Sequence, residues 1–194
     1  MNRMARGLLS AFTAATLSFA PTAAGASDEN VVVASNQTDG AAVVAAGVQY
    51  RIAPNGVVDE ENRAYAGASC TGCQTVAAAF QLVLVTREYR TFVPQNEAFA
   101  ANVACEECLT WASAKQVIVV TDGPATLSGA GHLRMQALEE RIQALQSDLP
   151  AMTLTGLFLE LDGAFAELLD IARTEIVNHD GGPANAEIAA TNES

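Results

Sequence analysis

The feature that most constrains the fold is an internal repeat that carries all four cysteines of the 194-residue chain. Residues 70–81 and 105–116 both follow the pattern C-x-x-C-x-T-x-A-x-A-x-Q without a gap, and N-x-A-aromatic-A precedes each copy. Agreement at so many fixed positions indicates a duplication. Two copies are fewer than a solenoid needs, so the expected arrangement is a pseudo-symmetric pair of units that share one core.

The pattern changes at the cysteines of each copy. Alternating alanines before the first cysteine predict a strand, while the composition after it favours a helix that can run into a strand. Residues 30–52 predict two more strands around the turn at residues 36–40. The interpretation is an α+β fold with a small antiparallel sheet and two duplicated strand–CxxC–helix units.

Two further stretches predict an antiparallel helical hairpin at residues 125–177. Their apolar residues recur at steps of three and four, which is the coiled-coil-like seam of an α-helix. Pro150 separates the two stretches, and Ser128 and Thr153 are the expected N-caps. The seams are expected to face the core, with docking of a protein partner as the alternative.

Six small polar residues recur with the repeat. Such residues at a tight corner satisfy backbone groups or cap helices more often than they bind a ligand. These positions are Asn62, Thr75, Gln81, Asn96, Thr110 and Gln116.

The N-terminus predicts export. Residues 1–26 combine a short basic region, an apolar stretch too short to span a bilayer comfortably, and the small residues Ala24-Gly25-Ala26. The expected signal peptide is cleaved near Ala26 and leaves a secreted or extracytoplasmic chain. The duplicated domain then covers residues 27–124, and residues 178–194 are expected to form a disordered acidic tail.

The charge balance excludes two classes of partner. Acidic residues outnumber basic ones 22 to 10, which gives a formal charge of −12. A protein that binds nucleic acid or an anionic membrane surface needs a basic footprint, and this chain has none. No later segment is long and apolar enough to predict a membrane span.

Three chemistries are open to Cys70, Cys73, Cys105 and Cys108. Export favours disulfides, for which three pairings exist, and we lean toward bonds between the copies over bonds within each CxxC. Four thiolates also match tetrahedral zinc, which is the alternative cofactor. Thiol–disulfide exchange is the third, since a helix N-terminus after CxxC stabilises a thiolate.

Motifs for other catalysts are absent from the sequence. It holds no HExxH, no GxSxG and no Walker loop. We therefore expect an exported, non-catalytic structural or interaction protein that is stabilised by disulfides. A zinc-binding module with four cysteine ligands or a CxxC thiol–disulfide oxidoreductase is the alternative.

The doubled cysteine motif also carries a resemblance. Together with T-D-G at residues 38–40 and V-V-D at residues 57–59, it resembles a family of secreted bacterial proteins over about residues 30–177. Some members carry the label of a peptide zinc metalloprotease, and no activity is established for the family. The resemblance implies secretion and a charged helical C-terminus. No catalytic residue carries over, because this sequence has no protease metal motif.

Overall fold

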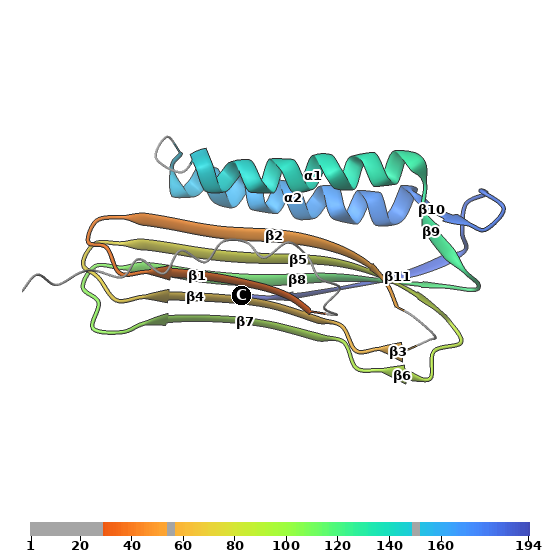
Figure 1. Ribbon diagram of the computed structural model, residues 1–194, viewed down its shortest axis with the longest axis horizontal. Helices are drawn as coiled ribbons and strands as arrows, with labels where there is room; N and C mark the ends of the chain where they lie inside the picture. The colour runs from red at the N-terminus through yellow and green to blue at the C-terminus, as the bar shows by residue number, and fades with distance from the viewer. Residues whose placement is uncertain (1–28, 54–56, 149–151) are drawn as a thin grey trace, which may run out of the picture.

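The computed structural model describes residues 29–53, 57–148 and 152–194. In it the chain winds into a parallel β-solenoid that a pair of helices covers on one side (Figure 1). Successive coils stack so that equivalent strands become neighbours in the same sheet. The expected small antiparallel sheet is therefore wrong, because all pairings between coils are parallel.

Two sheets form the long sides of the solenoid. The first contains β1 (Glu29–Asn36), β4 (Glu61–Ala68) and β7 (Gln95–Asn102), all parallel. The second contains β2 (Ala42–Ile52), β5 (Gln74–Thr86) and β8 (Leu109–Thr121), again parallel. A short parallel pair, β3 (Val57–Val58) and β6 (Thr91–Phe92), lies at the end away from the cysteines.

The register reveals a third copy of the repeat. Glu29 pairs with Glu61 and Ala42 with Gln74, so the coil beginning at β1 is equivalent to the coils with cysteines. In this first coil Asp39-Gly40 occupies the place of Thr71-Gly72. Two copies are too few for a solenoid, and for that reason the sequence did not predict one. The structure contains three copies, because a copy without cysteines forms the first coil.

The segments after the cysteines are strands, which corrects the predicted helices. β5 is buried at every residue from Thr75 to Val85, since one face meets the solenoid interior and the other meets the helices. A strand buried on both faces loses the alternation of apolar and polar residues that marks a half-buried strand. The continuous apolar run in β5 therefore gave no period-two signal.

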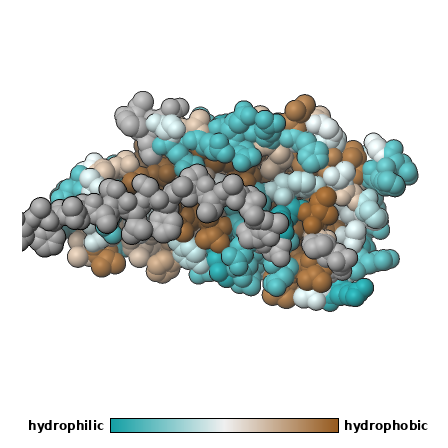
Figure 2. All heavy atoms as spheres, viewed as in Figure 1, coloured by the Kyte–Doolittle hydropathy of each residue, from teal (hydrophilic) through white to brown (hydrophobic). Residues whose placement is uncertain are grey.

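The helical hairpin is present and covers the outer face of the second sheet. It consists of α1 (Gly129–Asp148) and α2 (Leu154–Thr174), which lie side by side over β2, β5 and β8 (Figure 1). The predicted caps are confirmed: the Gly131 amide donates to Ser128 Oγ, and the Gly156 amide donates to Thr153 Oγ1. The side of the helices turned away from the sheet is mostly hydrophilic (Figure 2).

The C-terminal segment is ordered, contrary to the expected disordered tail. β9 (Ala125–Leu127) and β10 (Ile176–Asn178) form a small antiparallel pair at the base of the hairpin. β11 (Ala186–Glu193) then pairs antiparallel with β8. The free edge of β8 supplies the backbone partners that β11 needs, so a polar composition does not prevent it from folding.

The predicted signal peptide lies outside the described residues. No helix in the described ranges combines the length and apolar character needed to cross a bilayer.

Candidate functional site

The four cysteines meet at the corners where the chain passes from one sheet to the other. Each corner hydrogen-bonds to its neighbour, so the corners stack as the coils do. The Gly72 amide donates to the Glu106 carbonyl at 2.8 Å, and the Leu109 amide donates to the Cys73 carbonyl at 2.9 Å. In the first coil the Gly40 amide donates to the Thr71 carbonyl at 2.9 Å.

One backbone conformation recurs in the three corners. The residue before the second cysteine position has positive φ in every coil: 67° at Gly40, 64° at Gly72 and 55° at Glu107. This left-handed step folds the corner back within four residues. Glycine adopts it without strain, whereas Glu107 adopts it at a cost.

The tight corner determines how the cysteines pair. The disulfides join Cys70 to Cys73 and Cys105 to Cys108, with Cα–Cα distances of 6.1 and 6.0 Å. The preference for bonds between the copies was therefore wrong, and the pairing within each CxxC is the one that forms. The reason is local, because the turn already brings residues i and i+3 to bonding distance.

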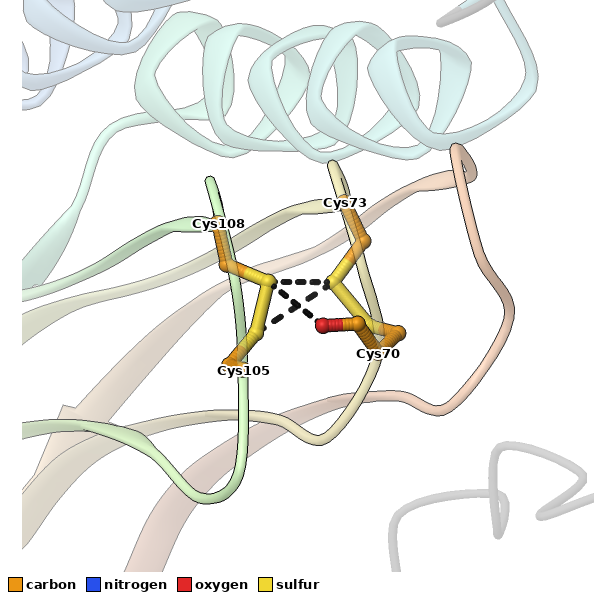
Figure 3. A group of neighbouring side chains, drawn as sticks. All are labelled: Cys70, Cys73, Cys105 and Cys108. Atoms are coloured by element: carbon orange, nitrogen blue, oxygen red, sulfur yellow. Dashed lines mark hydrogen bonds between the residues drawn. A yellow bond between two sulfur atoms is a disulfide. The ribbon is translucent and has the colours of Figure 1, made fainter.

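The two disulfides also touch each other across the coils (Figure 3). Cys73 Sγ lies 3.1 Å from Cys108 Sγ and 3.9 Å from Cys105 Sγ. All four Sγ atoms lie within 4.8 Å of one another. The pair in the second coil is buried, with Cys70 5% and Cys73 0% exposed, while Cys105 and Cys108 are half-buried.

The surroundings of the sulfurs offer little to redox catalysis. Each CxxC leads into a strand, so no helix N-terminus is present to stabilise a thiolate, which removes the physical basis of that hypothesis. Glu106 and Glu107 are exposed beside the outer pair, and their negative charge opposes a thiolate as well.

An asparagine ladder runs through all three coils inside the solenoid. Asn30 Nδ2 donates to Asn62 Oδ1, and Asn62 Nδ2 donates to Asn96 Oδ1, both at 2.7 Å. Each side chain also donates to a backbone carbonyl of the opposite sheet, at Phe80, Ala79 and Ala114 respectively. The ladder therefore ties the two sheets together as well as the coils.

A glutamine ladder runs parallel to it. Gln116 Nε2 donates to Gln81 Oε1 at 2.6 Å, and Gln81 Nε2 donates to Gln49 Oε1 at 2.8 Å. Gln81 and Gln116 are buried, at 0% and 1% exposed. Both ladders serve the fold, because their amide groups are consumed by one another and by the backbone.

The two threonines of the repeat differ in their environments. Thr110 Oγ1 donates to Asn102 Oδ1 at the edge of the third coil. Thr75 is fully buried, and its Oγ1 has no hydrogen-bond partner among the described residues. Thr75 is therefore a buried hydroxyl inside the solenoid rather than a cap.

Sequence reasoning missed the first-coil members of both ladders. Asn30 precedes Asn62, and Gln49 precedes Gln81, by the same 32 residues. That common offset, together with Asp39-Gly40 at the corner, is the signal that would have revealed the third copy. The first coil lacks the cysteines that mark the other two copies, and for that reason it escaped the sequence prediction.

Comparison with protein-family models, with curated proteins and with solved structures finds no match to this chain.

Proposed function

We propose that this chain is a non-catalytic structural or interaction protein that works outside the cytoplasm, where its disulfides persist. The observation that supports this best is the stack of two disulfides at one corner of the solenoid. Each disulfide closes the turn of its own coil, the two disulfides touch across the coils, and the neighbouring side chains do not activate them. Such a corner serves mechanical stability.

The solenoid interior supports the same proposal. The space between the two sheets is filled by small side chains: Val32, Ala34, Ala64, Ala66, Ala77, Ala79, Ala112 and Ala114. Sheets packed this closely on methyl groups leave no room between them for a substrate at these positions. Recognition then takes place on the outer surface.

Alkylation of the denatured protein, followed by peptide mass spectrometry, tests the proposal. We expect no free thiol before reduction, four thiols after it, and disulfide-linked fragments that join Cys70 to Cys73 and Cys105 to Cys108. Four alkylated cysteines without reductant, or bonds between the two motifs, would contradict it.

The stabilising role of each disulfide can be measured separately. Closing a loop of about four residues contributes roughly 2 kcal/mol to the free energy of unfolding in the chain-entropy model. We expect the pair Cys105→Ala with Cys108→Ala to lose about that much in urea denaturation. In the variant that replaces all four cysteines, added reductant should no longer lower the melting temperature.

A structural zinc site is the second candidate, supported by the mutual distances of the four sulfurs. Tetrahedral zinc with Zn–S bonds of about 2.3 Å places its sulfurs roughly 3.8 Å apart. The contacts of 3.1 and 3.9 Å between coils and the 4.8 Å limit bracket that distance. Reduced Cys70, Cys73, Cys105 and Cys108 therefore fit the ion, which would hold the corner as the disulfides do.

Zinc and disulfides exclude each other, because zinc binds thiolates. Purification without reductant, followed by metal analysis and thiol titration, separates the two candidates. One zinc per chain with four thiols supports the metal site, and no zinc with no thiols supports the disulfides. The variant Cys108→Ser is the control, since it removes one ligand and should abolish stoichiometric zinc binding.

A further inference from the structure

The first sheet ends at the third coil with an open strand edge. β7 is the last strand of this sheet, and no strand of the described ranges pairs with its outer edge (Figure 1). β11 extends the second sheet on the same side, but it ends level with Asn96, because Asn96 Nδ2 donates to the Ala114 carbonyl and Ala114 is the pairing partner of Glu193. β11 therefore reaches only the first residues of β7. An open strand edge is a template for another strand.

The side chains show that the third coil is less covered than the first. In β1 the inward residues Val32 and Ala34 are 9% and 2% exposed. In β7 the inward residue Ala98 is half-buried, Ala100 is exposed, and the outward Phe99 is 57% exposed. A further strand beside β7 would cover all three of these residues.

The free backbone groups of β7 follow from its bonds to β4. The amides of Gln95 and Val103 donate to the carbonyls of Glu60 and Ala68. The amide and carbonyl of one residue point to the same side of a strand, and this side alternates along the chain. Odd-numbered residues of β7 therefore face β4, while even-numbered residues point their amides and carbonyls out of the sheet. These outward residues are Asn96, Ala98, Ala100 and Asn102.

The outward groups make β7 complementary to itself. In an antiparallel pair, two opposite residues that both face the partner strand exchange two hydrogen bonds. When Phe99 lies opposite its equivalent in a second copy, Ala98 pairs with Ala100 and Asn96 pairs with Asn102, and the same pairs repeat beyond the axis. A shift of two residues in either direction loses one of these pairs. The register centred on Phe99 therefore uses the free groups of β7 most fully.

The second sheet leaves room for this arrangement. β8 contacts both β4 and β7 across the interior, and β5 contacts both β1 and β4, so the sheets are staggered by half a strand spacing. β11 consequently lies half a spacing beyond β7, at the height of a twofold axis that runs perpendicular to the first sheet. The β11 strands of the two copies then enter the same layer from opposite sides. They do not collide, because each ends level with Asn96 and the axis passes at Phe99.

The side chains of β7 also suit this pairing. On the inward face Ala98 lies opposite Ala100, which continues the small-residue interior from one copy into the other. On the outward face the two Phe99 rings become neighbours at a pair without hydrogen bonds, where side chains come closest. Glu97 lies opposite Ala101, so the acidic side chains of the two β7 strands are not opposed.

We propose that the outer edge of β7 is a self-association surface, on which two copies of this chain form a dimer by antiparallel pairing of β7 with β7 about a twofold axis at Phe99. The same surface is used by both copies, so the contact closes on itself and does not propagate. The inference rests on the proposed interaction role and deepens it by naming a second copy of the chain as the partner.

Light scattering coupled to size-exclusion chromatography, with sedimentation velocity, tests the proposal over a range of concentrations. We expect a reversible species of twice the monomer mass. Phe99→Glu and Phe99→Lys each place like charges opposite one another on the axis, and each should weaken dimerisation about tenfold or more. A mixture of the two variants should form a heterodimer, since opposite charges then face each other.

Matched controls use another member of the same exposed row. Val33 is in register with Phe99 through Tyr65 and is 61% exposed, but it lies on β1 at the far side of the first sheet. Val33→Glu and Val33→Lys should therefore dimerise as the natural chain does. Equal weakening by the Val33 and Phe99 variants would overturn the proposal.

Hydrogen exchange on the unmodified chain provides a second measurement, which does not depend on the folding of any variant. The amides of Ala98 and Ala100 should exchange more slowly as concentration rises, whereas that of Ala101, which faces β4, should not change. A monomer at every soluble concentration, an open polymer, or a mixture of Phe99→Glu and Phe99→Lys that stays monomeric would overturn the proposal. Thiol titration is unaffected by these outcomes, so the corner disulfides stand or fall separately.

Discussion

The two faces of the sheet formed by β2, β5 and β8 are packed in opposite ways. The inner face carries alanines such as Ala77 and Ala79 against β1, β4 and β7. The outer face carries Phe80, Leu82 and Leu84 against the helices. Neighbouring residues of one strand therefore obey different size limits. The tight corners and the asparagine ladder, which bonds to carbonyls of the opposite sheet, fix the width of the inner gap, whereas the side chains themselves set the distance between the sheet and the helices.

Substitutions at two adjacent residues of β5 test the difference between its inner and outer faces most directly. Phe80→Ala should destabilise the protein by about 3–5 kcal/mol, since it empties a site where Phe80 stacks on Phe165 at 6.1 Å between ring centroids. Ala79→Leu should destabilise by about 1–3 kcal/mol or more for the opposite reason, overpacking. Urea denaturation measures both.

Ala101→Leu is the control for added volume. Ala101 is half-buried on the side of β7 that points away from the alanine interior, so the added carbons do not enter the gap between the sheets and should change stability by less than about 0.5 kcal/mol. If Ala79→Leu were equally harmless, the narrow interior would not be the constraint on side-chain size.

Two buried hydroxyls, one on each face, sharpen the comparison further. Thr75 faces the interior and Ser113 faces the helices, and neither oxygen has a hydrogen-bond partner among the described residues. Thr75→Val and Ser113→Ala should each stabilise the protein by about 1 kcal/mol, because each removes an unsatisfied polar group. Thermal unfolding would detect this, and a loss of stability would indicate a partner such as ordered water.

A substitution at the corner of the third coil should give a smaller gain in stability. Glu107→Gly relieves a positive φ of 55° at a position where the earlier coils have glycine, and should stabilise by roughly 0.5–1 kcal/mol. Gly72→Ala is the reciprocal control and should destabilise by a similar amount. Equal stability of Glu107→Gly and the natural chain would show that the strain is already relieved.

The smallest expected effect is pH-dependent and confined to the base of the helical layer. Glu175 accepts a hydrogen bond from Ser128 and pairs with Arg134, which together hold the pKa of its carboxyl below the usual value. Its stabilising contribution is therefore present above the ordinary carboxyl pKa of about 4.3 and is lost as pH falls through the lowered value. The melting-temperature difference between the natural chain and Glu175→Gln should shrink between about pH 6 and pH 3. A difference that stays constant over this range would contradict a stabilising role of the Glu175 carboxylate.

The sequence predicted the helical layer better than the solenoid. Helix seams and the caps at Ser128 and Thr153 depend on local spacing, which a single sequence displays. The coils depend on pairing between residues that lie 32 to 35 positions apart. Two motifs with cysteines revealed part of that period, but the first coil uses Asp39-Gly40 and was overlooked.

The candidate site was located correctly but paired wrongly. The repeat placed Cys70, Cys73, Cys105 and Cys108 together, and their sulfurs do converge. The choice between pairings depends on corner geometry, namely the left-handed step at Gly72 and Glu107, which spacing alone does not show. β11 was missed because its partner is the edge of β8, a tertiary feature without a local signature.

The uniform coil spacing has a consequence for the surface of the first sheet. Val33, Tyr65 and Phe99 stand in register on consecutive strands and point away from the alanine interior, with Val33 61% and Phe99 57% exposed. They form a row of large side chains with one residue per coil, and neighbouring members are about 4.8 Å apart. Gain or loss of a whole coil would lengthen or shorten this row by one side chain, while the packing between the two sheets stayed the same. The length of the exposed row can therefore change without any change in the interior.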